Sequence, residues 1–331
     1  MKRSLYIKNP IWCLVFSLIS SVYIPASGQN NLNENLIPVI DGDWWQVSGD
    51  PDLGSYTTPK QQPVDFAIWQ AFDGTWQILS CIRGTKCGGK NRLLYRWQGS
   101  NIKDHDWHPM GIFMEADTSF GETLGGLQAP YVMKIENEYY MFYGDFANIC
   151  IAKGVDGKTF ARQLNSENRS GVFSEGSGNN TRDVMVIRKE DLFYAYYTAS
   201  QGDDGYVFVR SSRDLKSWSP SKVVAYGGSA GFGKNKTECP FVYFHEQSGF
   251  YYLFRTQRYG LNAQTMVYRS KDLMDFGVND DWSLVTMIPV AAPEIFESEG
   301  QLYIAALMNS LKGIMIAKLK FVPKDYDNKN R

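Results

Sequence analysis

Three carboxylates, Asp65, Asp183 and Glu238, each stand at the start of an apolar, aromatic run that is typical of a buried β-strand. A protonated carboxyl group can donate a proton, and an ionised one can attack carbon or accept a proton. Cleavage of a glycosidic bond uses two such groups in these two states. Taken singly, each of the three also fits a structural role, in which it accepts a backbone N–H or pairs with an arginine. The choice depends on whether the fold brings them together.

A unit of short strands separated by turns recurs five times between residues 63 and 322. The first strand of each unit begins at an equivalent position, and the steps between these positions are 63, 55, 55 and 53 residues. The five positions are Asp65, Gln128, Asp183, Glu238 and Ala291. A period of this length, with several strands in each repeat and no helical pattern, is typical of propeller blades. We therefore predict an all-β fold, a five-bladed β-propeller in a single domain.

The propeller fold would gather the strand heads in one place. The first strand of each blade lines the central channel, so equivalent positions in different blades converge near one mouth of that channel. Three of the five positions carry a carboxylate. Like charges held together raise the pKa of at least one group, which suits general acid catalysis near neutral pH. Three carboxylates at equivalent positions therefore favour catalysis over three separate structural roles.

The order of these residues along the chain resembles that of the five-bladed propeller glycosidases of glycoside hydrolase families 32 and 43. The resemblance extends over essentially the whole chain after residue 28, and it is most specific at Arg182-Asp183 and at Glu238-Cys239-Pro240. It implies that Asp65 is the nucleophile or general base and that Glu238 is the general acid. It also implies that Asp183 orients the substrate and tunes the pKa of the acid, and that Arg182 donates hydrogen bonds to sugar hydroxyls. Furanosides, such as arabinofuranosyl or fructosyl units, are the substrates implied.

Some family features are missing from this sequence. The segment around Asp65 lacks the Asn-Asp-Pro-Asn-Gly pattern of family 32, and Val184 rather than proline follows Asp183. Little chain remains beyond Phe321 for the β-sandwich that follows the propeller in family 32. We therefore expect a member of the superfamily without assigning it to a known family.

Four further side chains are candidates for binding the substrate. They are Gln128 at a strand head, Trp69 just past Asp65, Asp145 at the end of a second strand and Arg255 at the end of another. A tryptophan can stack on a sugar face, although packing in the core is the commoner use. The loop that contains Arg83 is a further candidate for the border of the cleft.

The N-terminus has the pattern of an export signal. Basic residues are followed by an apolar segment at residues 11–19 and by small residues that end at Gly28. We expect cleavage near Gly28 and a secreted or periplasmic protein, with a turn-rich lead-in at 29–62, the propeller at 63–322 and a polar tail at 323–331. The apolar segment is too short for a membrane span. The net charge of −1 becomes −4 without the signal, and no cluster of basic residues suggests nucleic-acid binding.

Four cysteines remain after residue 28, and Cys81 and Cys87 flank a turn. An oxidising compartment permits a disulfide there, and two buried thiols are the alternative. Zinc fits less well, because the three histidines do not cluster with the cysteines in the sequence. We expect neither a metal nor a cofactor.

The function that the sequence favours is hydrolysis of a glycosidic bond in an oligosaccharide or polysaccharide. Two alternatives share the same scaffold. One is a glycan-binding propeller without catalysis, in which the carboxylates only accept hydrogen bonds from sugar hydroxyls. The other is a glycoside phosphorylase, which needs a basic phosphate pocket, with Arg182, Arg255 and Arg258 as its candidates.

Overall fold

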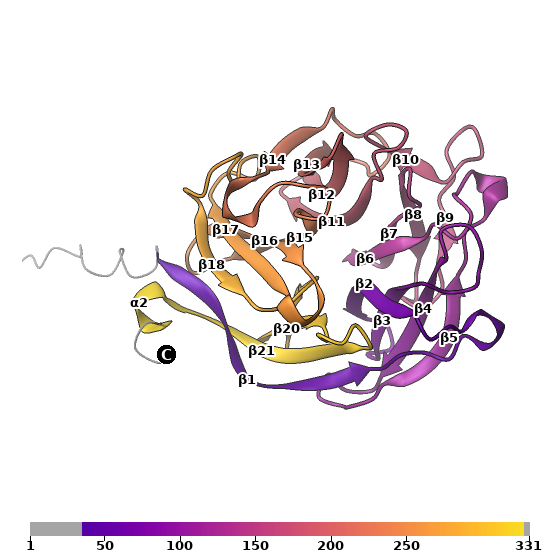
Figure 1. Cartoon of the computed structure of the whole chain (residues 1–331), viewed down its shortest axis with the longest axis horizontal. Helices are drawn as coiled ribbons and strands as arrows, with labels where there is room; N and C mark the ends of the chain where they lie inside the picture. The colour runs from indigo at the N-terminus through magenta and orange to yellow at the C-terminus, as the bar shows by residue number, and fades with distance from the viewer. Residues whose placement is uncertain (1–34, 328–331) are drawn as a thin grey trace, which may run out of the picture.

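The computed structural model describes residues 35–327, and the expected signal at 1–28 and the last four residues of the expected tail lie outside them. Within the described chain the strands form five sheets arranged as the blades of a propeller (Figure 1). Blade one contains β2 (Gln62–Gln70), β3 (Trp76–Arg83), β4 (Arg92–Gly99) and β5 (His108–Met114). Blade two contains β6 (Gln128–Ile135), β7 (Glu138–Gly144), β8 (Ile149–Gly154), β9 (Ala161–Arg162) and β10 (Gly171–Phe173). Blade three contains β11 (Arg182–Lys189), β12 (Leu192–Gln201), β13 (Asp204–Ser212) and β14 (Lys222–Ala225).

Blade four contains β15 (Glu238–His245), β16 (Phe250–Arg258), β17 (Gln264–Ser270) and β18 (Leu284–Ile288). Blade five contains β19 (Glu294–Ser298), β20 (Gln301–Leu307), β21 (Ile314–Pro323) and β1 (Leu36–Ser48). Helical structure in the described part is limited to the short helix α2 (Lys324–Asp327) and to 3-10 turns at Gly54–Tyr56, Thr118–Phe120, Gly228–Ala230 and Gly260–Asn262. The described residues include no helix long and apolar enough to cross a membrane. The five-bladed all-β fold predicted from the repeat is therefore confirmed.

The ring is closed by pairing the two ends of the described chain. β1 runs antiparallel to β21, from Leu36 opposite Pro323 to Ser48 opposite Ile314, and the two strands lie side by side in Figure 1. This corrects the expected domain boundary, because residues 36–48 are the outer strand of blade five rather than a lead-in. Both ends of β1 are buried, whereas its middle, which includes Asp41 and Asp43, is partly or fully exposed, as suits an outer strand.

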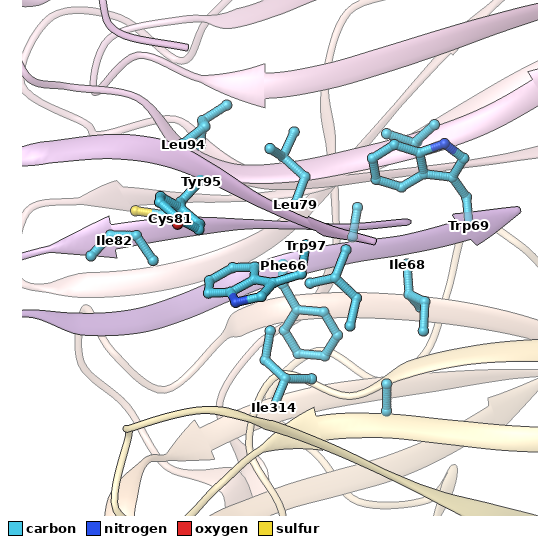
Figure 2. Packing of buried hydrophobic residues seen from close by; sticks show 14 of the residues in the cluster. Phe66, Ile68, Trp69, Leu79, Cys81, Ile82, Leu94, Tyr95, Trp97 and Ile314 are labelled. Atoms are coloured by element: carbon cyan, nitrogen blue, oxygen red, sulfur yellow. The ribbon is translucent and has the colours of Figure 1, made fainter. Parts of the chain in front are cut away.

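Each blade packs against its neighbours through apolar side chains. In blade one, β2 and β3 are buried along most of their length, and Figure 2 shows Phe66 and Trp97 on one face of the blade and Leu79 on the other. The sequences of these strands are mostly apolar because side chains on both faces of the strands are buried. Burying one such side chain stabilises the fold by about 1.5 to 3 kcal/mol.

Near the start of the innermost strand of each blade lies a residue in the left-handed backbone region, and none of the five is glycine. These residues are Asp65, Ala129, Asp183, Cys239 and Ala292, with φ of 42°, 45°, 58°, 45° and 49°. In blades one to four the pairing register with the second strand shifts at this point, which is the signature of a β-bulge. The left-handed conformation costs about 1 to 2 kcal/mol in a residue with a side chain.

The bulges show which residues occupy equivalent positions in the different blades. Asp65 and Asp183 are bulge residues, whereas Glu238 comes one residue before its bulge at Cys239. The equivalents of Glu238 are Gln128 and Arg182. The alignment made from the sequence therefore mixed two neighbouring positions, and side chains at these two positions point in different directions because successive residues of a strand alternate.

Candidate active site

The two neighbouring positions form two connected layers at the centre of the propeller. An open pocket of about 220 Å³ is lined by Gln128, Arg182 and Glu238 together with Asp65. Beside it lies a smaller cavity of about 20 Å³, the inner cavity, whose lining includes all five left-handed residues. The inner cavity has room for about one water molecule. Asp65 lines both spaces and so connects the two layers.

Glu238 and Arg182 form a buried ion pair in the wall of the open pocket. Nη2 of Arg182 donates to Oε1 of Glu238, and Nε lies 3.4 Å from Oε2. Arg182 is fixed from behind by the backbone carbonyls of Asn180 and Lys234, at 2.9 and 3.0 Å. The pair is thus a charge-assisted contact that fixes the Glu238 carboxyl group in the pocket wall.

Asp183 lies beneath that pair and lines the inner cavity. Its Oδ2 accepts the backbone N–H of Cys239 at 3.1 Å and lies 3.6 Å from Nε of Arg182. Its Oδ1 is buried and has no hydrogen-bond partner among the described residues. Burial and the charge of Glu238 raise the pKa of Asp183 well above its ordinary value, and Arg182 opposes the rise. The charge of Asp183 therefore interacts with the charges of Glu238 and Asp65.

Asp65 is held by two donors from blade four. Its Oδ1 accepts from the hydroxyl of Tyr259 at 3.1 Å and from the thiol of Cys239 at 3.2 Å. Burial raises the pKa of both donors well above their ordinary values, so each keeps its proton. Burial, followed by the charge of Glu238, raises the pKa of Asp65, while Arg92 lowers it. Asp65 is thus a base that is stronger than an ordinary aspartate.

The four other candidates from the sequence have different positions. Gln128 lines the pocket, where its Oε1 accepts from Arg92 at 3.0 Å and its Nε2 donates to Asn180 at 2.7 Å. Trp69, Asp145 and Arg255 line neither space. The Trp69 indole donates to the carbonyl of Gly157, and the Asp145 carboxylate holds its own turn by accepting from the backbone of Ala147 and Asn148. Arg255 is fully buried and binds the carbonyls of Gly231 and Lys236. Each of these three has a structural role in the fold.

Several residues of the site were not singled out from the sequence. Tyr259 and Arg92 line the open pocket beside Arg83, and Asn180 and Asn235 complete it. Glu294 lines the inner cavity, and burial raises the pKa of its carboxyl well above the ordinary value. A signal for Arg92 did exist in the sequence: Arg83 and Arg92 flank one loop, so pairing of the two strands places them opposite each other.

The cysteines are free thiols, and Cys81, Cys87, Cys150 and Cys239 form no disulfide. Cys81 is buried, and its thiol donates to the carbonyl of Leu127 at 3.4 Å. In the described chain, the set of side chains spaced to share a cation is Asp65, Asp183 and Cys239, with ligand atoms within 4.8 Å of one another. Hydrogen bonds join Cys239 to both aspartates.

Solved structures of other proteins have a similar architecture, whereas comparisons of sequence find no relative. No family model matches the sequence, and no curated protein matches it. Among solved structures, an endo-arabinase from Bacteroides thetaiotaomicron matches with a TM-score of 0.58 and 15% identity, covering 82% of this chain and 97% of that one. The fold is similar to the propeller of glycoside hydrolase family 43. The GH43_1 enzyme from Xanthomonas citri, complexed with xylotriose, matches with a TM-score of 0.58 and 14% identity over 79% of this chain and 88% of its own.

A structure from a second glycoside hydrolase family also has a similar propeller. The catalytic domain of the GH62 α-L-arabinofuranosidase of Coprinopsis cinerea matches with a TM-score of 0.56 and 13% identity. The match covers 84% of this chain and 96% of that domain. The resemblance to propeller glycoside hydrolases noted in the sequence is thus confirmed at the level of the fold.

Proposed function

We propose that the protein is a glycoside hydrolase whose working carboxyl groups are Asp65 and Glu238. The observation that carries this proposal is that both groups, although far apart in the sequence, line one open pocket at the mouth of the propeller. A pocket with two carboxyl groups and several amide and guanidinium donors suits a polyhydroxylated sugar. Solved structures with this fold include arabinanases, xylosidases and arabinofuranosidases.

The two groups have opposite tasks in this proposal. Glu238, once protonated, donates its proton to the glycosidic oxygen as the bond to the anomeric carbon breaks. Asp65, ionised, either attacks the anomeric carbon or removes a proton from the attacking water, whose oxygen becomes the new anomeric hydroxyl. Tyr259 and Cys239 hold Asp65 in place and favour its ionised form through their hydrogen bonds.

Arg182 links Glu238 to the substrate in this proposal. In the free protein Arg182 pairs with Glu238. When a sugar binds, Arg182 donates to sugar hydroxyls, and the Glu238 carboxyl group turns to the glycosidic oxygen.

Export and substrate class belong to the same proposal. The N-terminal pattern of basic, apolar and small residues favours secretion or a periplasmic location. An oligosaccharide or polysaccharide is the substrate class that fits such a location, and furanosides follow from the resemblance to family 43.

Aryl glycosides, furanosides included, test this proposal. We expect Glu238→Gln and Asp65→Asn each to lower kcat/KM by at least about 100-fold on a 4-nitrophenyl substrate. A 2,4-dinitrophenyl leaving group needs little protonation, so it should rescue Glu238→Gln but leave Asp65→Asn inactive. Full activity in either variant contradicts the assignment. Binding of glycans without any release of sugar supports the glycan-binding alternative instead.

A further inference from the structure

Two arginines of blade one form an unusual pair at the edge of the open pocket. Arg83 ends β3 and Arg92 begins β4, and the two residues lie directly opposite each other in the register of these strands. Both side chains line the pocket that holds Asp65 and Glu238. Like charges directly opposite each other on adjacent strands are destabilising. The pair therefore needs a reason beyond the fold.

Neither arginine has a carboxylate partner among the described residues. Nε and Nη2 of Arg83 both donate to Oε1 of Gln62, at 2.9 and 2.7 Å. Arg92 donates through Nη1 to Oε1 of Gln128 at 3.0 Å, and its guanidinium lies 4.9 Å from the centre of the Phe146 ring. Amide oxygens and a ring orient these guanidinium groups but do not neutralise them.

Other partly buried arginines of the protein are paired differently. Arg162 binds Glu122 at 2.8 Å, and Arg210 binds Glu175 at 2.6 Å. Buried Arg255, in contrast, binds backbone carbonyls, so a carboxylate partner is not general for the arginines of this fold. Arg83 and Arg92 differ from all three in lining the open pocket, where a substrate would enter.

The carboxyl groups around the pocket act on Arg83 and Arg92 through their charge but not through a hydrogen bond. Arg182 is engaged by Glu238 and lies close to Asp183. Asp65 is the remaining carboxylate, and its hydrogen bonds come from Tyr259 and Cys239 rather than from either arginine. An anionic group of the substrate could accept hydrogen bonds from the remaining N–H groups of both guanidinium groups.

We propose that Arg83 and Arg92 form a subsite for an oxyanion carried by the sugar itself, a carboxylate as in a uronic acid or a sulfate ester. This inference rests on the proposed function, because it names the substrate class of the same pocket. The planar fork of a guanidinium group matches such oxyanions with two parallel hydrogen bonds. A neutral sugar would leave both charges unpaired, so the subsite selects against it.

Matched pairs of substrates test the subsite. We would measure kcat/KM for 4-nitrophenyl glucuronides, galacturonides and 6-sulfated galactosides of both anomers against the corresponding neutral glucosides and galactosides. An acidic member should be cleaved at least about 10-fold better than its neutral partner, as expected for charge-assisted hydrogen bonds. Binding of free glucuronate, galacturonate and galactose 6-sulfate, and of inorganic phosphate, would be measured by calorimetry on the same full-length protein.

Variants assign the effect to the two arginines. Arg83→Gln and Arg92→Gln should each raise KM for the acidic substrate by about 10-fold or more and weaken binding of the acidic monosaccharide equally. Arg213, which is exposed beyond the end of β13 and outside the pocket, supplies the matched control. Arg213→Gln should change neither value. Circular dichroism and thermal melting identify any variant that fails to fold, and Arg→Lys at the same two positions then replaces it.

The outcomes separate this inference from the proposed function. Cleavage of neutral glycosides with no preference for acidic ones overturns the inference and supports hydrolysis. Binding of an acidic sugar that Arg83→Gln abolishes, without cleavage of any glycoside, supports the subsite and contradicts hydrolysis. Sugar release that requires inorganic phosphate assigns the two arginines to a phosphate co-substrate and overturns the inference. The inference of an oxyanion subsite is also overturned if the protein binds none of the acidic sugars.

Discussion

Tyr259 and Asp65 show how a single hydrogen bond can set the working pH of the site. The Tyr259 hydroxyl donates to Oδ1 of Asp65 at 3.1 Å, which stabilises the ionised carboxylate. We expect Tyr259→Phe to remove that donor and to raise the pKa of Asp65 further above its ordinary value. Because Asp65 works in the ionised form, the acid limb of the kcat/KM profile should move to higher pH.

The pH profile of wild type and Tyr259→Phe, measured on the same aryl glycoside, tests this expectation. Activity on the alkaline side of the acid limb should be less affected, since Asp65 is ionised there in both proteins. An acid limb that stays in place would show that Asp65 is not the group whose ionisation limits the reaction. Met110→Leu, at an exposed residue that does not line the pocket, serves as a control.

Asp183 carries a stability cost that a neutral residue would remove. Its folded-state pKa lies well above the ordinary value because of burial and the charge of Glu238. The folded protein therefore holds the proton more tightly than the unfolded chain, and folding is penalised increasingly as pH rises from about 4 through the folded-state pKa. We expect Asp183→Asn to raise Tm at pH 7, with about 2 to 4 °C for each kcal/mol gained, while activity falls.

Thermal melts at pH 7 and pH 4 test the sign. The gain in Tm from Asp183→Asn should shrink at pH 4, where the folded-state carboxyl group is protonated and the unfolded one is already about half protonated. A lower Tm at pH 7 would mean that the charged carboxylate stabilises the fold, for example through Arg182, and would contradict this account. Such a trade between stability and activity is common at catalytic sites.

At the level of the strands, the bulges decide which side chains reach the pocket. Ala129 and Ala292 adopt the left-handed conformation with no chemical role that requires their side chains. Glycine adopts this conformation without strain but loses more entropy on folding. We expect Ala129→Gly and Ala292→Gly to leave the free energy of unfolding unchanged or to raise it by up to about 1 kcal/mol.

Ala67 supplies the matched comparison, because it is equally buried in β2 and has no left-handed backbone. Ala67→Gly should lower the free energy of unfolding by about 1 kcal/mol, as glycine does in the interior of a strand. Denaturant unfolding of the three variants measures the difference. Equal losses in all three would show that the bulges are not strained.

The strand heads also show which features of the fold and of the site could be predicted from the sequence. The repeat was visible because each blade needs a buried, apolar inner strand followed by a turn, so five blades and the convergence of Asp65 and Glu238 could be predicted. The bulge offset could not, because its left-handed residues are Asp, Ala and Cys rather than glycine. Tyr259 reaches Asp65 from blade four across the channel, and such a contact has no local signal.

At the level of the whole molecule, one strand pair holds the ring of blades shut. β1 and β21 come from opposite ends of the described chain, and Ile37 of β1 is 3% exposed opposite Val322. Without this pairing, β21 would be an open edge and blade five would lose its outer strand. The positions of all inner strands depend on a closed ring, so the geometry of the pocket depends on β1 as well, although β1 lies on the outside of the ring (Figure 1).

Ile37→Ala tests whether closure stabilises the entire propeller or only its rim. Removing a buried isoleucine side chain costs about 2 to 5 kcal/mol, and a cooperative ring should lose this from its global unfolding. Tryptophan fluorescence and far-ultraviolet circular dichroism should then shift together to lower denaturant, while Asp43→Asn, at an exposed position of the same strand, shifts neither. If β1 merely frays, hydrogen exchange will rise in residues 36–48 alone and the global transition will stay in place. Coincident loss in all blades is the expected result, because each inner strand is packed between two neighbours and cannot open without them.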